Sequence, residues 1–142
     1  SFVSNVAKLG VNLNSEQLKI ISQQRHLTPS GSFASRPLEN LTSDQNLNVH
    51  FNKHRKEFKN LNTKEQYLQG AIDFHNRKSP SITYYFDTTS FAKKYQSNVI
   101  KFDAKTYELS AMRLGGDITT YYTSGIPSLK RFVPVPEDFY FN

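Results

Sequence analysis

Apolar residues recur at helical spacing in the middle of the chain. Phe51 and Phe58 are seven residues apart and so share one face of a helix, which predicts a helix over residues 49–59. Further on, Thr63 and Gln66 have the spacing of a capping box, in which each side chain bonds the backbone N–H of the other residue. We therefore predict a second helix from about 63 to 76. Its apolar positions at helical periods are Tyr67, Leu68, Ala71, Ile72 and Phe74.

The pattern before residue 49 is weaker. Residues 1–13 show no clear period, whereas an apolar stripe behind a capping signal at Asn14 or Ser15 predicts a helix from about 15 to 25. Residues 27–48 are rich in Ser, Thr, Asn, Gly and Pro and nearly free of apolar pairs. That composition predicts a linker or an irregular loop.

From Ser81 onward the period becomes that of strands. Ile82, Tyr84 and Phe86 occupy alternate positions, which is typical of a half-buried strand. Three more strands are predicted over residues 99–102, 106–112 and 118–123, with turns at 103–105 and 115–117. The tail from Ile126 contains three prolines, so we expect it to form an extended cover over the core.

The order of these elements, helices first and strands second, is that of an α+β domain. The strands follow one another through short turns, which predicts an antiparallel four- to five-stranded β-meander.

The charge of the chain also changes near residue 49, where the first clear apolar pattern begins. Residues 1–48 carry 4 basic and 3 acidic side chains, and residues 49–142 carry 14 basic and 9 acidic ones. We expect an N-terminal helix and linker over 1–48 and the functional domain over 49–142.

Composition narrows the function. The chain has 142 residues, enough for one domain with a core, and its 11 Phe and 8 Tyr argue against disorder despite a mean hydropathy of −0.61. A net charge of +6 favours an anionic partner: nucleic acid, an acidic protein or a membrane surface.

The lack of Cys excludes disulfides and thiolate zinc sites. The sequence has no apolar run of transmembrane length and no signal-peptide pattern. Because it starts at Ser, we expect a piece of a longer protein.

The predicted helix over 49–59 concentrates the candidate chemistry. It holds two histidines, His50 and His54, and three basic residues, Lys53, Arg55 and Lys56. Nearby cations lower the pKa of an imidazole, and a neutral His beside them can take a proton from a hydroxyl close to a phosphate. The alternative is a solvated, charged helix face. His50 and His54 also have the spacing of a zinc pair, but a third ligand is not evident.

The last predicted strand offers a second group of candidates. Alternate side chains of a strand face opposite ways, so Thr120 and Tyr122 share a face and could contact a phosphate and stack on a base. A register shifted by one residue would present Thr119 and Tyr121 instead. The alternative to both is ordinary strand packing. For His75, near the end of the second helix, we expect a structural role.

Three segments together resemble a known toxin family. The motif Phe-x-Lys-His-x-x-x-Phe at residues 51–58 resembles the Lys-His element of the colicin D ribonuclease domain. It is still more similar to the C-terminal tRNase toxins of contact-dependent growth inhibition effectors, the CdiA family. In that family a Tyr-Leu-x-x-Ala helix follows, matched here at residues 67–71, and then a β-meander whose last strand resembles residues 116–122.

This resemblance, over about residues 49–123, implies a fold and a function. The fold is the one shared by barnase, EndoU, colicins and RelE (BECR). The implied activity is metal-independent cleavage of tRNA, without a cofactor, in which the RNA 2′-OH attacks the adjacent phosphorus. The implied catalytic residues are His54, Lys53, Thr120 and Tyr122. Colicin D has a second Lys where this chain has Phe51, so the second cation is open. Its candidates, which we also expect to bind substrate, are His50, Arg55, Lys56 and Arg113.

The family also implies partners and a location. Its members belong to secreted or cell-surface effectors, deliver the C-terminal domain to the cytoplasm of a target bacterium, and are neutralised by a cognate immunity protein. A host translation factor can also be required. Two other classes stay open: a non-catalytic basic RNA-binding module of a secreted effector, and, for residues 1–48, the end of a region that delivers the toxin into cells.

Overall fold

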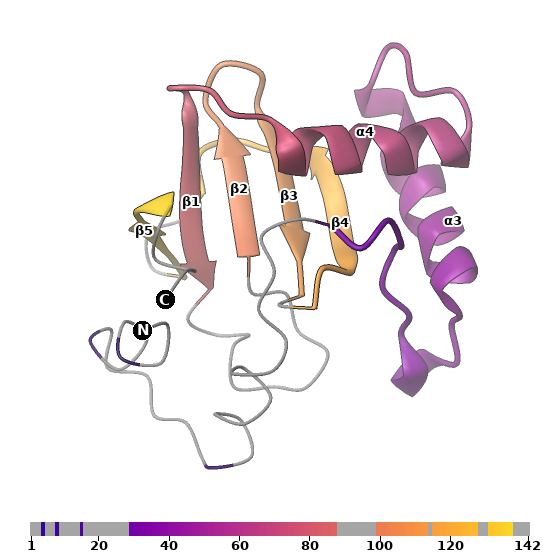
Figure 1. Ribbon diagram of the computed structural model, residues 1–142. Coiled ribbons are helices and arrows are strands. Elements are labelled where there is room, and N and C mark those ends of the chain that lie inside the picture. Colours follow the sequence, from indigo (N-terminus) through magenta and orange to yellow (C-terminus); the bar gives the residue numbers. More distant parts are fainter. Residues whose placement is uncertain are drawn as a thin grey trace.

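The computed structural model describes residues 29–87, 99–113, 115–127 and 131–137, together with the single positions Ser4, Lys8 and Ser15. Within these residues, two α-helices precede a five-stranded antiparallel sheet, which confirms the predicted α+β class (Figure 1). The helix predicted from about 15 to 25 lies outside the described residues, Ser15 apart.

The first four strands lie close to the predicted ranges, and among them neighbours along the chain pair with each other. Their order in the sheet is β4-β3-β2-β1-β5. The first four strands therefore form the predicted meander, and β5 returns to pair with β1. The strands are β1 (Ile82–Asp87), β2 (Val99–Asp103), β3 (Glu108–Met112), β4 (Ile118–Thr123) and β5 (Phe132–Val135).

Strand β5 refines the expectation for the C-terminal tail. Its residues are extended, as predicted, and they pair with β1, with Tyr85 opposite Pro134. A proline is tolerated there because β5 is an edge strand, where a missing N–H need not interrupt a ladder. Val135 packs against the main core and Phe132 against a second buried cluster. The tail thus widens the sheet at the end away from β4.

Helix α3 (Ser43–His54) begins earlier than the predicted start at residue 49 and continues into a 3₁₀ turn, η2 (Arg55–Glu57). Thr42 and Gln45 form a capping box that starts the helix within a polar stretch. The predicted linker over 27–48 is therefore wrong for residues 43–48, and the predicted boundary after residue 48 falls inside α3.

The segment before α3 is also built into the fold. Phe33 is buried and bridges Ile118 of β4, and Ala34 N donates to Ile118 O. Ser30 N donates to Gly116 O in the turn before β4. These bonds occupy part of the outer edge of β4, which would otherwise present unpaired backbone groups.

Helix α4 (Lys64–Asn76) crosses one face of the sheet near β3 and β4, while α3 lies beside the β4 edge (Figure 1). Its capping box between Thr63 and Gln66 is confirmed. Tyr67, Ala71 and Phe74 are fully buried in the main core. The main core also contains Phe33, Leu47, Phe51, Phe86, Val99, Met112, Ile118 and Tyr121. A second buried cluster comprises Tyr85, Ile100, Phe102, Leu109 and Ala111, with Tyr122 packed against it.

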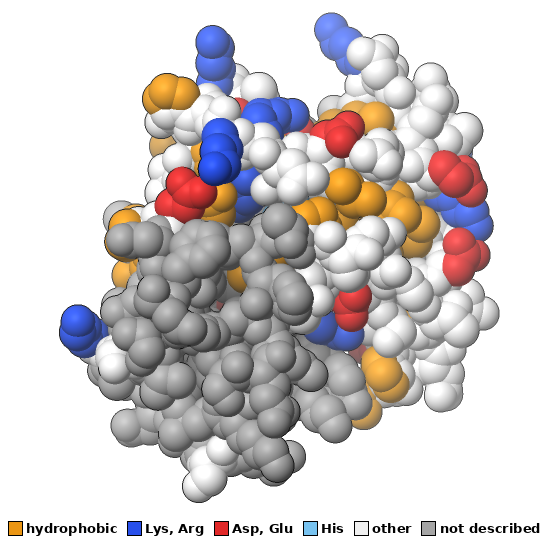
Figure 2. Space-filling model, in the orientation of Figure 1, with side chains coloured by type: hydrophobic (Ala, Val, Ile, Leu, Met, Phe, Trp, Pro, Cys, Tyr) orange, Lys and Arg blue, Asp and Glu red, His pale blue; other side chains and the backbone are white. Residues whose placement is uncertain are grey.

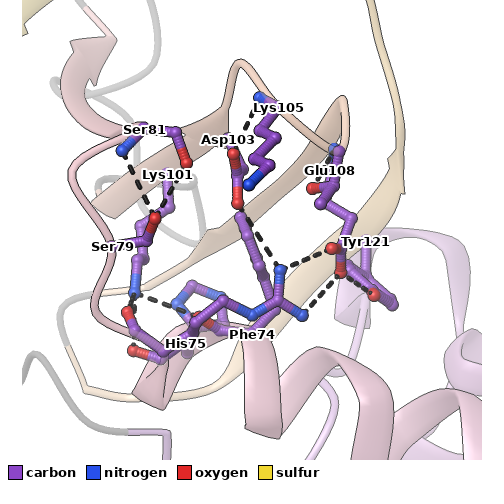
Figure 3. A network of polar contacts seen from close by, with 11 residues as sticks. Phe74, His75, Ser79, Ser81, Lys101, Asp103, Lys105, Glu108 and Tyr121 are labelled. Carbon is purple, nitrogen blue, oxygen red and sulfur yellow. Dashed lines mark hydrogen bonds and ion pairs between the residues drawn. The ribbon is translucent and has the colours of Figure 1, made fainter.

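A polar network joins the end of α4 to the sheet (Figure 3). Lys101 of β2 is buried, and its Nζ donates to the carbonyls of Phe74, His75 and Arg77 at 2.8–3.0 Å. Those carbonyls lie in the last turn of α4 and at its C-cap, Arg77, where backbone acceptors lack helical partners and a cation is favoured. Beside them, Arg77 pairs with Glu108 of β3. Lys101 therefore supplies the cation at this helix end, which fits a structural role for its neighbour His75.

Candidate functional site

Two histidines of α3 lie against two residues of β4. The rings of His50 and His54 are 5.9 Å apart between centroids. Oγ1 of Thr120 is 3.4 Å from His50 Nδ1, and the Tyr122 ring stacks on His54 at 5.3 Å with an interplanar angle of 21°. The i, i+4 spacing on the helix and the period of two on the strand thus bring four sequence-predicted residues together.

The register of β4 selects Thr120 and Tyr122 over the alternative pair. Pairing with β3 shifts between Ala111 and Met112, which lie opposite Thr120 and Ile118. Thr119 Oγ1 donates to Ala111 O. Tyr121 is 3% exposed and packs in the main core. Of the two candidate pairs, Thr120 and Tyr122 lie beside the histidines.

Glu57 completes the group and was missed by sequence reasoning. Its Oε2 lies 2.6 Å from His54 Nδ1, and its Oε1 accepts hydrogen bonds from the backbone N and Oγ1 of Thr123, both at 2.9 Å. Burial alone would raise the pKa of Glu57, but the bonds from His54 and Thr123 outweigh it and leave the pKa below its ordinary value. The i, i+3 spacing from His54 was the available signal.

The ionised Glu57 fixes the tautomer of His54. A carboxylate only accepts hydrogen bonds, so the proton of this bond belongs to His54 Nδ1 and Nε2 is left for another partner. Among the described residues, the buried side-chain nitrogen and oxygen atoms without a partner are Asn46 Oδ1 and His75 Nδ1. Nε2 of His54 is therefore not sealed inside the protein, although the side chain is only 10% exposed.

His50 has different surroundings. It is half-buried, and its ring packs 5.1 Å from that of Phe33. Burial, followed by the positive charges of His54, Arg36 and Lys53, lowers the pKa of His50 to about 4. His50 is thus a neutral imidazole at pH 7 and is unsuited to be the second cation there.

The predicted basic residues of this region lie on the surface. Lys53, Arg55 and Lys56 are exposed, and the Arg55 guanidinium lies 5.0 Å from the Phe51 ring centre. Arg113 Nη2 instead donates to Ser35 O at 2.8 Å, which anchors the segment before α3. On the face shown in Figure 2, described Lys and Arg side chains are interspersed with Asp and Glu.

Within the described ranges, His, Asp and Glu side chains form no group of three or more that could hold a metal ion. The arrangement of His50, His54, Glu57, Thr120 and Tyr122 offers proton transfer and hydrogen bonding beside an aromatic ring. None of the helices that the structure describes is long and apolar enough to cross a membrane.

Comparisons with family profiles, curated proteins and solved structures return no match. The interpretation of the site therefore depends on its own geometry and on the motif resemblance.

Proposed function

We propose that the chain is a metal-independent endoribonuclease whose site comprises His54, Lys53, Thr120 and Tyr122. The observation that carries the proposal is the His54 ring, held by Glu57 through Nδ1 and stacked on Tyr122, with Nε2 left unpaired. An imidazole positioned in this way is suited to general acid/base catalysis. An RNA substrate would supply the phosphate for the cations and a base for the aromatic ring.

The reaction would be an internal phosphoryl transfer. The 2′-oxygen of a ribose forms a bond to the adjacent phosphorus as the bond from phosphorus to the 5′-oxygen breaks. The 2′-OH loses a proton and the departing 5′-oxygen gains one, which leaves a 2′,3′-cyclic phosphate and a 5′-OH. His54 would transfer protons, Lys53 would offset phosphate charge, and Thr120 would donate to a phosphate oxygen.

The finer proposal depends on the motif resemblance. It is a BECR-type tRNase toxin of the contact-dependent growth inhibition class, delivered into the cytoplasm of competing bacteria and neutralised by an immunity protein. The Lys-His motif, the Tyr-Leu-x-x-Ala helix and the last strand of the meander support it. In the structure these segments lie at the end of α3 and in η2, in the middle of α4, and in β4.

Incubation of the purified protein with total RNA, with and without EDTA, tests the activity. We expect tRNA fragments that end in a 2′,3′-cyclic phosphate in both reactions. Intact RNA would contradict the proposal, and cleavage abolished by EDTA would contradict the metal-independent chemistry. The His54→Ala protein in the same assay controls for contaminating ribonuclease.

A cognate inhibitor should be acidic where it meets the exposed residues Lys53, Arg55 and Lys56. Complementary charge speeds association and fixes orientation, so binding should slow markedly as salt rises. Stopped-flow association at low and high salt measures this, and charge reversal at Lys56 should weaken the salt dependence. A rate insensitive to salt would contradict the prediction.

A non-catalytic RNA-binding module is the second candidate. It is favoured by the burial of His54, which is 8% exposed, and by the Glu57 bridge to Thr123, because both would also serve to hold η2 against β4. A His54→Ala protein that binds RNA as before, when the parental protein does not cleave it, would support this function.

A further inference from the structure

His50 and His54 are one helical turn apart, yet their polar partners differ in kind. His50 Nδ1 is within 3.4 Å of a neutral hydroxyl, that of Thr120. His54 Nδ1 bonds to the carboxylate of Glu57. Two titratable groups with contrasting environments in one site are a common basis for dividing acid and base roles.

We propose that His50 is the general base and His54 the general acid of the cleavage reaction, and that Glu57 is the positioning residue for His54. This inference depends on the proposed ribonuclease function and deepens it. It adds a second catalytic histidine and a carboxylate to the site predicted from the sequence.

The surroundings of His50 suit a base. Its ring is neutral at pH 7, so one nitrogen has a free lone pair. If Nδ1–H donates to Thr120 Oγ1, that lone pair is on Nε2, which can take the proton of the 2′-OH. Burial, followed by the charges of His54, Arg36 and Lys53, disfavours a second proton on the ring before the substrate is bound. The anionic phosphate of the substrate would offset those charges during the reaction.

The surroundings of His54 suit an acid. Glu57 Oε2 lies 2.6 Å from Nδ1, where it stabilises positive charge on the ring and holds the ring plane. The other Glu57 oxygen is fixed by two bonds from Thr123, so the carboxylate itself is held to β4. A proton on Nε2 can then pass to the departing 5′-oxygen.

The roles balance over one turnover. His50 gains the proton lost by the 2′-OH as the new oxygen–phosphorus bond forms. His54 loses a proton to the 5′-oxygen as the old bond breaks. Exchange with water then restores the neutral His50 and the protonated His54, so no co-reactant is needed.

An RNA substrate with sulfur in place of the bridging 5′-oxygen separates the two roles, because a thiolate leaves without a proton. On ordinary RNA we expect His50→Ala and His54→Ala each to reduce cleavage by about 10²–10⁴-fold. On the sulfur substrate His54→Ala should regain most of the parental rate, whereas His50→Ala should not. The parental rate should also rise with pH near the His50 pKa of about 4, and this rise should be absent in His50→Ala.

Glu57→Gln tests the positioning role against a matched control, Glu65→Gln. Glu57→Gln should slow cleavage of ordinary RNA and be rescued by the sulfur substrate. Glu65→Gln makes the same carboxylate-to-amide change on the exposed first turn of α4, outside the site, and should keep the rate near the parental value. Circular dichroism checks that each variant is folded, and His50→Gln or His54→Gln replaces any Ala variant that is not.

Rescue of His50→Ala by sulfur, or a His50→Ala rate equal to the parental one, would overturn the inference while leaving the ribonuclease function intact. Absence of cleavage by the parental protein would overturn both.

Discussion

The last turns of α3 and α4 each carry a histidine, and the two ends differ in the charge placed beside it. At the end of α4, His75 is 4% exposed, and the cation Lys101 bonds the surrounding carbonyls. His75 Nε2 bonds Ser110 Oγ at 2.9 Å, and Nδ1 has no partner. At the end of α3, His54 faces the carboxylate of Glu57. Burial, together with the nearby cation, keeps the His75 imidazole neutral, whereas a carboxylate fixes the orientation and tautomer of the His54 ring.

Substitutions at the two histidines should differ most in their effect on RNA cleavage. His54→Ala should reduce RNA cleavage by about 10²–10⁴-fold, and Lys53→Ala should also abolish detectable cleavage, with both proteins folded. His75→Ala should leave the rate per folded molecule unchanged, because its ring is enclosed in the core. Rates from a labelled tRNA assay, corrected for the folded fraction, measure this. A His54→Ala protein that cuts at the parental rate would contradict the assignment.

The second effect is on stability against acid. Burial, then the charge of Lys101, lowers the pKa of His75 from 6.5 to about 3. Between about pH 6.5 and pH 3, the unfolded chain therefore binds a proton on His75 that the folded state does not bind. The contribution of His75 to the free energy of unfolding is fully present above pH 6.5 and is lost as the pH falls. At about 1.4 kcal/mol per unit of pKa, the full loss is on the order of 5 kcal/mol.

Urea unfolding at a series of pH values measures this loss, and His75→Gln should flatten the dependence. The pKa of His50 is lowered to about 4, so His50 contributes to the acid sensitivity with the same sign. His50→Gln should therefore flatten the pH dependence less than His75→Gln does. A parental protein equally stable across this range would show that His75 is not held neutral.

The starts of the two helices could be predicted from the sequence only in part. Periodicity and the Thr63 capping box predicted α4 almost to the residue. The Thr42 capping box was hidden because the residues after it, Ser43 to Asn46, are polar, and only Asn46 among them is buried. Its amide donates to Ala34 O, a tertiary contact that local composition does not encode.

The site shows the same limit. Helical and strand periods predicted which residues share a face, and the pairs His50–His54 and Thr120–Tyr122 follow from them. Glu57 lies in a 3₁₀ turn, and its partner Thr123 is on a strand far away in the sequence. The pairing of β5 with β1 likewise depends on where the tail returns, and no local pattern specifies that.

The third prediction compares two lysines. Lys101→Met should lower the free energy of unfolding by about 2–3 kcal/mol, because three buried carbonyls at the end of α4 lose a charged donor. Lys53→Met, on the exposed surface, should change it by less than about 0.5 kcal/mol while impairing cleavage. Urea midpoints and cleavage rates of the two proteins give both results. Equal midpoints would show that Lys101 does not stabilise the helix end.

The smallest effects concern the adjacent tyrosines of β4, which face opposite ways. Tyr122 stacks on His54 and is half-buried, whereas the Tyr121 hydroxyl donates to Glu108 inside the protein. If Tyr122 stacks on a base, Tyr122→Ala should weaken RNA binding by about 1–3 kcal/mol. Tyr122→Phe keeps the ring and should bind nearly as well, and a large loss of cleavage in that variant would instead make the phenol part of the chemistry.

Tyr121→Phe is the matched control for the neighbouring position. It removes one donor from Glu108, which keeps its pairing with Arg77, so the protein should lose about 1 kcal/mol of stability with unchanged RNA affinity. Binding is best measured with a substrate whose 2′-OH at the cut site is replaced by hydrogen, since cleavage cannot then interfere. Weaker binding by Tyr121→Phe than by Tyr122→Ala would mean that the core-facing tyrosine governs RNA binding. The opposite order would locate the nucleotide on the His54 side of β4.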